Sequence, residues 1–277
     1  MVVIAVLRDI TLGQFVPGQS FIHKLDARFK TVLIIAFTVL VFVSKNFASI
    51  GLVAVLLVGA SAASRIPAKL LIRSFKPLLP FILFTVILNM FYVDGQILWQ
   101  FWVLKITKEG LLLSAMMALR IIFMLLGGSL LTFTTSPIVL TDALERLMKP
   151  LSWVKVPVHD IAMMMTIALR FIPTLIDETE KIMNAQKARG ADLESGGPLK
   201  RAKALIPILV PLFVSAFKRA DELALAMECR CYTGGKGRTR LKQMKAAPRD
   251  GFAVLITAAV TAGVIWLNAI LPPIITR

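Results

Sequence analysis

The chain has 277 residues, of which 57% are hydrophobic, and it carries a formal net charge of +16. Its mean hydropathy is +0.78. Soluble domains are usually apolar at about half of their positions and lack long apolar runs, so this composition excludes an ordinary soluble domain. The sequence therefore predicts an integral membrane protein.

Five apolar segments are long enough to cross a bilayer, whose hydrocarbon core of about 30 Å requires roughly 20 helical residues. These predicted spans are residues 29–47, 48–64, 77–93, 110–134 and 251–272. We expect an all-α integral membrane protein with about five transmembrane helices.

Two connections between the spans have patterns of their own. Residues 65–76 contain four basic side chains and no acid, which predicts an interfacial helix whose cations extend to the headgroups rather than another span. Residues 94–105 alternate loosely and include Trp99 and Trp102, which favours an interfacial hairpin.

The basic residues indicate the orientation, because short cytoplasmic loops collect Lys and Arg. Residues 1–30 hold four basic residues, 65–76 hold four and 145–249 hold nineteen. The alternate side holds Lys45, Lys105, Lys108 and Arg277. We therefore expect a cytoplasmic N-terminus and an external C-terminus.

A long segment between the fourth and fifth spans divides the chain into three regions. These are an N-terminal membrane region at 1–134, a cytoplasmic region at 135–250 and a C-terminal transmembrane helix at 251–277. The middle region is too long to be a structureless loop. In it we expect a short helix from Ser136 to Lys149 and two long helices at 159–189 and 198–231.

Both long helices are predicted to be amphipathic and to bend at prolines, which remove backbone donors. The prolines are Pro173 in the first helix and Pro207 and Pro211 in the second. Such helices can lie against the membrane at one end and reach into the cytoplasm at the other. The apolar stripe of the second helix recurs at three- and four-residue steps, at Leu205, Leu209, Leu212, Ala216, Leu223 and Met227.

Each long helix ends in an arginine between small residues, in Ala188-Arg189-Gly190 and in Cys229-Arg230-Cys231. A purely structural interpretation exists, because a cation in the last turn complements the helix dipole and Gly190 can supply a left-handed cap. The small neighbours also leave room for another protein to close over the guanidinium and offer a carboxylate for bidentate pairing. Two such ends on matching helices favour a docking role.

With these motifs the chain resembles a known family, the transmembrane T component (EcfT/CbiQ-like) of energy-coupling factor (ECF) transporters, the vitamin and metal importers of prokaryotes. The resemblance spans nearly the whole chain. It rests on Phe15 to Gly18, His23 to Arg28, Ala168 to Pro173 and the two arginine motifs. Ala188-Arg189-Gly190 matches the family's Ala-Arg-Gly motif fully, whereas the second motif departs from it at both flanks and keeps Arg230.

The resemblance implies a non-catalytic subunit of an ABC-type importer in the prokaryotic cell membrane, with two long cytoplasmic coupling helices. It would transmit the conformational change of two ABC-type ATPase subunits, EcfA- and EcfA′-like, to a substrate-binding membrane S component for uptake of a vitamin or other micronutrient. ATP and Mg would be bound by the ATPases, with no cofactor held by this chain and no nucleic acid as a partner.

The resemblance also assigns site residues. The ATPase-docking residues would be Ala188, Arg189, Gly190, Cys229, Arg230 and Cys231. The S component would meet an adaptable apolar surface, for which methionine is suited because its side chain is unbranched. The candidates for that surface are Met163, Met164, Met165, Leu205, Leu209 and Leu212.

Other chemistry has less support in the sequence. Two cysteines cannot complete a four-ligand zinc site, so we expect free thiols and no metal. The turn from Gly234 to Gly237 lacks the G-x-x-x-x-G-K-[ST] pattern, and we interpret it as a flexible basic turn. Asp177 to Glu180 has no second acidic motif and is predicted to be a solvated face. Arg120 lies inside a span, where a charge is costly, and is a functional candidate.

Two alternatives from other classes stay open. A self-sufficient secondary transporter would need polar groups converging at the middle of the membrane and broken, repeated spans. A membrane-embedded transferase would need paired acidic motifs at the cytoplasmic boundary, which only Asp177 to Glu180 approaches.

Overall fold

The computed structural model describes residues 15–92, 96–101, 104–191, 197–234 and 246–272. These residues fall into two compact units. The bundle unit contains the described residues of 13–143 and 243–277, and the hairpin unit contains those of 144–242. The three regions expected from the sequence stay a prediction. Sequence predictions for Asp94-Gly95, Trp102, Gly235 to Gly237 and Arg277 lie outside the described residues.

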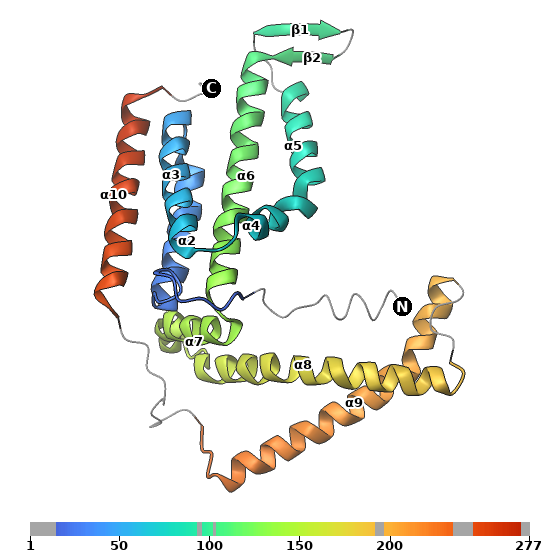
Figure 1. Ribbon diagram of the computed structural model, residues 1–277. Coiled ribbons are helices and arrows are strands. Elements are labelled where there is room, and N and C mark those ends of the chain that lie inside the picture. The colour runs from blue at the N-terminus through green and yellow to red at the C-terminus, as the bar shows by residue number, and fades with distance from the viewer. Residues whose placement is uncertain (1–14, 93–95, 102–103, 192–196, 235–245, 273–277) are drawn as a thin grey trace. The chain divides into compact units, whose positions relative to one another are not determined.

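The bundle unit consists of helices and one pair of strands (Figure 1). Its elements in chain order are α2 (Ala27–Val43), α3 (Phe47–Ser64), α4 (Ala68–Phe75), the 3-10 turn η1 (Lys76–Leu78), α5 (Leu79–Tyr92), β1 (Ile97–Phe101), β2 (Leu104–Thr107), α6 (Lys108–Thr134) and α10 (Pro248–Ile270). Helix α7 (Pro137–Met148) begins in this unit and ends in the hairpin unit.

Helices α2 and α6 begin where a side chain caps the first turn. The carboxylate of Asp26 accepts a hydrogen bond from the backbone N–H of Arg28 at 2.9 Å, and the hydroxyl of Thr107 accepts one from Gly110 at 3.1 Å. These bonds satisfy backbone donors that have no partner within the helix. The starts of both helices are therefore fixed by local sequence.

The core of the bundle unit lies where α2, α3, α6 and α10 meet. Its buried members include Phe37, Val41, Val53, Leu57, Leu130, Phe133 and Val264. Gly127 lets α6 approach α2 closely, because a Cβ at this position would lie 2.7 Å from the ring of Phe37. Ile66 and Leu71, beside and within α4, also belong to this core.

Polar contacts join the helices at one end of the bundle unit. The backbone N–H of Asp26 donates to the Asp250 carboxylate at 2.9 Å, which joins the starts of α2 and α10. The ammonium of Lys30 donates to the carbonyl oxygen of Thr134 at 3.0 Å and to the hydroxyl of Thr135 at 3.1 Å, which joins α2 to the end of α6. The starts of α2 and α10 therefore lie beside the end of α6.

A second set of contacts joins the helices at the opposite end. The side-chain amide of Asn268 donates to the carbonyl oxygen of Val43 at 2.9 Å and accepts from the hydroxyl of Ser49 at 2.8 Å. The guanidinium of Arg120 donates to the carbonyl oxygen of Ser44 at 2.6 Å. Helices α2 and α10 therefore run from the first end toward the second, and α3 and α6 run in the opposite direction.

Five runs in the described part of the chain are long and apolar enough to cross a membrane. They are Phe47–Ser64, Ala68–Tyr92, Lys108–Thr134, Val158–Ala188 and Pro248–Ile270. The expected fold class, a helical membrane protein with about five spans, is confirmed, but the membership differs from the prediction. Helix α2 has 17 residues, at the lower limit for a span, whereas Val158–Ala188 qualifies by length and composition alone.

The third predicted span is a broken helix. Helix α5 has 14 residues, about 21 Å, which is less than the bilayer core of about 30 Å. The run that is long enough begins at Ala68 and includes α4. The predicted boundary between 76 and 77 is present as the turn η1, and the short helix α4 before it carries the basic residues Lys69 and Arg73. Its location at the membrane interface stays a prediction.

Strands β1 and β2 pair antiparallel between α5 and α6, with Gln100 opposite Lys105. The hairpin expected over 94–105 is confirmed in its strands, which extend two residues further, to Thr107. Thr107 then caps α6. The strand pair therefore leads directly into the longest helix of the bundle unit.

The hairpin unit contains the end of α7 and the two longest helices of the chain. Its other elements are the 3-10 turn η2 (Lys149–Val154), α8 (Val158–Ala188) and α9 (Pro198–Cys229). The positions expected from the sequence, 159–189 and 198–231, are confirmed to within two residues. Pro173, Pro207 and Pro211 lie inside the helices without ending them; the bends expected there stay a prediction.

Candidate functional site

Helices α8 and α9 pack against each other in an antiparallel pair. The hydroxyl of Tyr232, just beyond α9, donates to the sulfur of Met163 at 2.9 Å. Farther along, the side chain of Gln186 donates to the carbonyl oxygen of Pro207 at 3.4 Å. Positions late in α8 therefore face positions early in α9, and the reverse.

Glu178 joins the two helices between these contacts. Its carboxylate accepts a hydrogen bond from the hydroxyl of Ser215 and forms an ion pair with Arg219 at 2.7 Å. The sequence prediction of a solvated acidic face did not anticipate these partners, which lie 37 and 41 residues away, although the side chain of Glu178 stays 23% exposed. Asp177 is exposed, as predicted.

The antiparallel packing places the two arginine motifs at opposite ends of the pair. Arg189 follows the end of α8, near the start of α9, and Arg230 follows the end of α9, near Met163 at the start of α8. At 1.5 Å per residue, the 23 residues from Met163 to Gln186 extend about 35 Å along α8. The two motifs are thus too far apart to contact one small partner surface.

The last turn of α8 is closed by a hydrogen-bond pattern that requires a left-handed residue after Arg189. The N–H of Ala191 donates to the carbonyl of Gln186 at 3.0 Å, and the N–H of Gly190 donates to that of Lys187 at 3.0 Å. Gly190 has a φ of 83°, which glycine adopts without steric cost. The predicted left-handed cap is confirmed.

Helix α9 ends in the same pattern. The N–H of Tyr232 donates to the carbonyl of Met227 at 3.0 Å, and the N–H of Cys231 donates to that of Glu228 at 2.8 Å. Cys231 takes the place of Gly190, with a φ of 55°. Sequence reasoning missed this because a left-handed conformation is uncommon for residues other than glycine. The two arginines stand in equivalent backbone settings.

Both motifs present their arginines to solvent. All six docking candidates, Ala188, Arg189, Gly190, Cys229, Arg230 and Cys231, are exposed. Within the described part of the chain, neither Arg189 nor Arg230 forms an ion pair with this protein's own acids. Both guanidinium groups are therefore free to donate hydrogen bonds to a carboxylate of another protein. Cys229 and Cys231 are free thiols in the structure.

We expect the substitution Cys231→Gly to stabilise the end of α9, because a non-glycine residue in the left-handed region costs roughly 1 kcal/mol. Cys231→Val should destabilise it, since a β-branched side chain tolerates this conformation poorly. Thermal unfolding of the purified protein checks both changes, with Cys229→Val as the control inside the helix. Equal unfolding temperatures for the glycine and valine variants at 231 would contradict the strain.

The six candidates for the S-component surface do not share one environment. Met164 and Met165 are exposed, at 61% and 39%, and so are Leu205 and Leu209. Met163 lies under Tyr232, and Leu212 is half-buried on the side of α9 that also carries buried Ile208. The predicted stripe therefore divides, with part of it facing α8.

Sequence reasoning missed a larger exposed apolar face on α9. Its members are Ile206, Val210, Phe213, Val214 and Phe217. They recur at three- and four-residue steps like the predicted stripe, so periodicity alone could not decide which face is covered. The contact of Glu178 with Ser215 and Arg219 decides it, because it turns that side of α9 toward α8.

The remaining candidates lie apart from the two arginine motifs in sequence and chemistry. Arg120 donates a hydrogen bond to the carbonyl of Ser44, the residue that follows α2. This charged side chain, which the sequence places in a span, therefore satisfies a carbonyl group at a helix end. Its Nε is buried without a partner among the described residues. In the same part of the chain, no cluster of His, Cys, Asp and Glu has the composition of a metal site.

The fold and these exposed ends define a class: a helical membrane protein with a separate antiparallel helix pair that presents an arginine at each of two remote ends. Comparison with known proteins identifies the family within this class. The family model described as CbiQ, cobalt transport protein, matches residues 18–241. The chain therefore belongs to this family, the EcfT/CbiQ transmembrane components of energy-coupling factor transporters.

Similar proteins carry the description energy-coupling factor transporter transmembrane protein EcfT. The relative from Thermosediminibacter oceani is 50% identical over 257 residues, covering 93% of this chain and 97% of the relative. The relative from Clostridium kluyveri is 49% identical over 269 residues, covering 94% and 99%. The relative from Bacillus subtilis is 42% identical over 262 residues, again covering 94% and 99%. The similarity extends over nearly the whole length of each protein.

Proposed function

We propose that this T component couples two ABC-type ATPases, EcfA- and EcfA′-like, to a substrate-binding S component that takes up a vitamin or other micronutrient. The observation that carries the proposal is the pair of equivalent helix ends, each with an exposed arginine followed by a left-handed residue. A spacing of about 35 Å suits two separate ATPase subunits better than one. The family membership supplies the transporter context.

The ATPases would each offer a carboxylate to one arginine. Planar guanidinium and carboxylate groups pair through two parallel hydrogen bonds, and the small residues beside each arginine let the partner surface approach. ATP and Mg would be held by these subunits, so the chain itself is a non-catalytic part of the transporter. The substrate would be held by the S component rather than by this chain.

The S component would pack against exposed apolar side chains of the hairpin unit. Met164, Met165, Leu205 and Leu209 belong to that surface, together with the face that includes Phe213 and Phe217. Apolar patches of this extent on a helix pair are typical of protein or membrane contacts. A movement imposed at the ends by the ATPases would pass along α8 and α9, which are held together at Glu178.

Purification of the full-length chain from its native membrane tests this function directly. We expect two ATPases and a small membrane protein to co-purify, and mass spectrometry of the latter would identify the S component. Recovery of the chain alone, with ATP-independent transport after reconstitution, would instead support a self-sufficient secondary transporter. Recovery without partners and with transfer activity would support the membrane-embedded transferase.

We further propose that the N-terminus of the chain is cytoplasmic. The end of the bundle unit where Asp26 contacts Asp250 also carries Lys24, Arg28, Lys30 and Arg249. The opposite end, near Asn268, carries Lys45. Short cytoplasmic segments collect basic residues, so the first end would face the cytoplasm.

Cysteine labelling checks this orientation in cells. In a variant without native cysteines, Lys45→Cys should react with a membrane-impermeant maleimide from outside, because it lies at the predicted external end. Lys24→Cys should react only after permeabilisation. Labelling of intact cells at 24 but not at 45 would reverse the orientation.

A further inference from the structure

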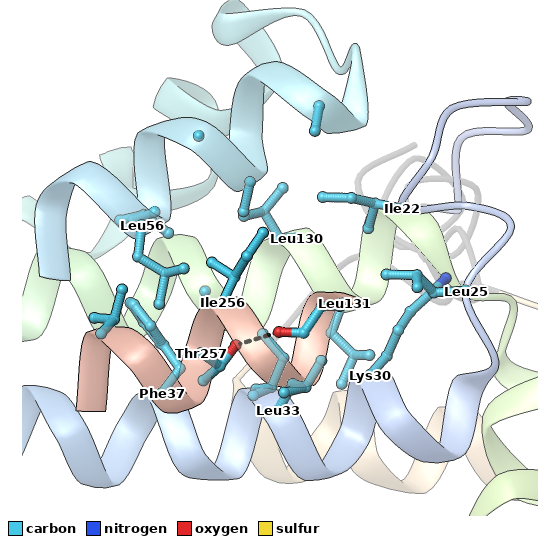
Figure 2. A pocket seen from close by; sticks show the side chains of 18 of the residues that line it. Ile22, Leu25, Lys30, Leu33, Phe37, Leu56, Leu130, Leu131, Ile256 and Thr257 are labelled. Atoms are coloured by element: carbon cyan, nitrogen blue, oxygen red, sulfur yellow. Dashed lines mark hydrogen bonds between the residues drawn. The ribbon is translucent and has the colours of Figure 1, made fainter. Parts of the chain in front are cut away.

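An apolar groove of about 510 Å³ lies inside the bundle unit, between α3 and α10 (Figure 2). Helices α2 and α6 form its floor with Leu33, Phe37 and Leu130, and Ile256 of α10 lies at one wall. On the α3 side the lining includes Gly59, where an added Cβ would meet no atom within 4 Å. The groove is therefore open space beside a glycine rather than a packed interface.

Helix α10 is fixed at both ends of the groove, so it cannot simply move inward and close it. At one end the carboxylate of Asp250 holds the backbone of Asp26. At the other end Val264 is fully buried and Gly263 approaches Leu52 closely. The groove-lining stretch, from Phe252 to Val260, lies between these two anchors.

The groove opens sideways between two helices that are long and apolar enough to cross the membrane. Val55 on α3 is 69% exposed, and Phe252 and Ile256 on α10 are also exposed. Water gains little in such an apolar space because it finds few polar partners. The lining is apolar and borders two helices that are long and apolar enough to lie in a bilayer. A lipid acyl chain is therefore the occupant of matching chemistry.

One end of the groove has the charge that a lipid headgroup requires. Phe21 and Phe252 meet edge to face there, with ring centroids 6.5 Å apart. Lys24 and Arg249, three residues from each ring, are exposed. Lys30 also lines the groove, but its ammonium is directed to Thr134 and Thr135. Among the described residues, Lys24 and Arg249 are therefore the exposed cations that we assign to the headgroup.

We propose that this groove binds one acyl chain of an anionic phospholipid, with the phosphate held by Lys24 and Arg249. The chain fills space that α10 cannot close, and the two cations select an anionic headgroup over a zwitterionic one. The site depends on the bundle unit alone and not on the docking of ATPases.

The test uses the full-length protein, with the subunits that co-purify, in vesicles of phosphatidylcholine and phosphatidylglycerol. A phosphatidylglycerol with a photoreactive group in its acyl chain should label residues of the groove. Gly59→Leu should lower this labelling about tenfold, because the new side chain fills the groove. Gly51→Leu is the matched control, since Gly51 lies on the same helix, also has open space around it and does not line the groove.

The headgroup is tested by Lys24→Gln combined with Arg249→Gln. This variant should reduce the preference for phosphatidylglycerol over phosphatidylcholine by about tenfold, while labelling by the phosphatidylcholine probe stays. Equal labelling of the Gly59→Leu and Gly51→Leu proteins would overturn the proposal. So would labelling that appears only after the other membrane subunit is removed, which would identify a protein segment as the occupant.

Discussion

The double substitution Arg189→Ala and Arg230→Ala is expected to abolish co-purification with both ATPases and ATP-dependent uptake. If each guanidinium is desolvated on docking, its removal leaves a buried carboxylate of the partner unpaired, which typically costs about 2–5 kcal/mol. That range corresponds to about 30-fold to a few thousand-fold in Kd for each site. An exposed pair would cost only about 0–1 kcal/mol, so the measurement separates the two cases.

Single substitutions refine the test. Arg189→Ala alone and Arg230→Ala alone should weaken the complex without abolishing it, because the motifs lie at opposite ends of the hairpin unit. Lysine at either position should rescue only in part, since an ammonium cannot form the two parallel bonds of a guanidinium. ATPase yield per mole of purified chain and initial rates of uptake are the two readouts.

Substitutions of Met164 and Met165 provide the contrast. Both side chains are exposed, and polar replacements there should reduce recovery of the S component while the ATPases stay attached. Met163 is unsuitable as a control, because it contacts Tyr232 next to the second arginine motif. Wild-type ATPase yield and uptake in the double arginine variant would refute docking and leave only the role of a helix cap.

Asp250→Ala is expected to lower the stability of the bundle unit by about 2–5 kcal/mol. Asp250 is 1% exposed, and its carboxylate accepts hydrogen bonds from the backbone N–H groups of Asp26 at 2.9 Å and Ala247 at 2.8 Å. Hydrogen bonds to a charged group contribute about 1.5–3 kcal/mol each, and their loss leaves two backbone donors without this acceptor. Asp250→Asn should fall between, because an amide retains one acceptor oxygen but loses the charge.

The midpoint temperature of thermal unfolding in detergent, followed by tryptophan fluorescence, measures this effect. Asp160→Ala is the matched control, because Asp160 stands in the first turn of α8 as Asp250 does in α10, and it is exposed. Its loss should cost about 0.3–1 kcal/mol, the value of an exposed acid near a helix N-terminus. Equal effects at 160 and 250 would show that Asp250 acts only through the helix dipole.

Local signals in the sequence were sufficient for the positions of most helices and for the left-handed cap at the end of α8. Apolar runs, Pro137 and the glycine at 190 predicted elements that the structure contains, because each depends on a few neighbouring residues. The cap at the end of α9 could not be predicted in this way, because its left-handed position is occupied by Cys231 rather than glycine. Only the backbone geometry identifies this cap.

Contacts between distant residues could not be predicted in the same way. Asp26 and Asp250 are 224 residues apart, and Arg120 and Ser44 are 76 apart. The sequence indicates only that a charge at Arg120 is costly in lipid. It does not reveal that the carbonyl group at the end of α2 lies beside this residue. The groove between α3 and α10 also depends on how four helices pack, and no periodicity in one of them predicts it.

If the ends of α8 and α9 dock to two ATPases as proposed, their repeated geometry bears on how the chain would distinguish the two subunits. Both arginines are followed by a left-handed residue and closed by the same two backbone hydrogen bonds, so a single type of socket could accept either one. The choice of ATPase would then depend on the residues beside each arginine. Ala188 and Gly190 at one end contrast with the larger Cys229 and Cys231 at the other. A socket shaped for the cysteines could accept the smaller pair with a loss of packing, whereas one shaped closely around alanine and glycine would exclude the thiols by steric clash. Discrimination would therefore be one-sided, and an error in assembly would favour the end of α8 entering the wrong subunit.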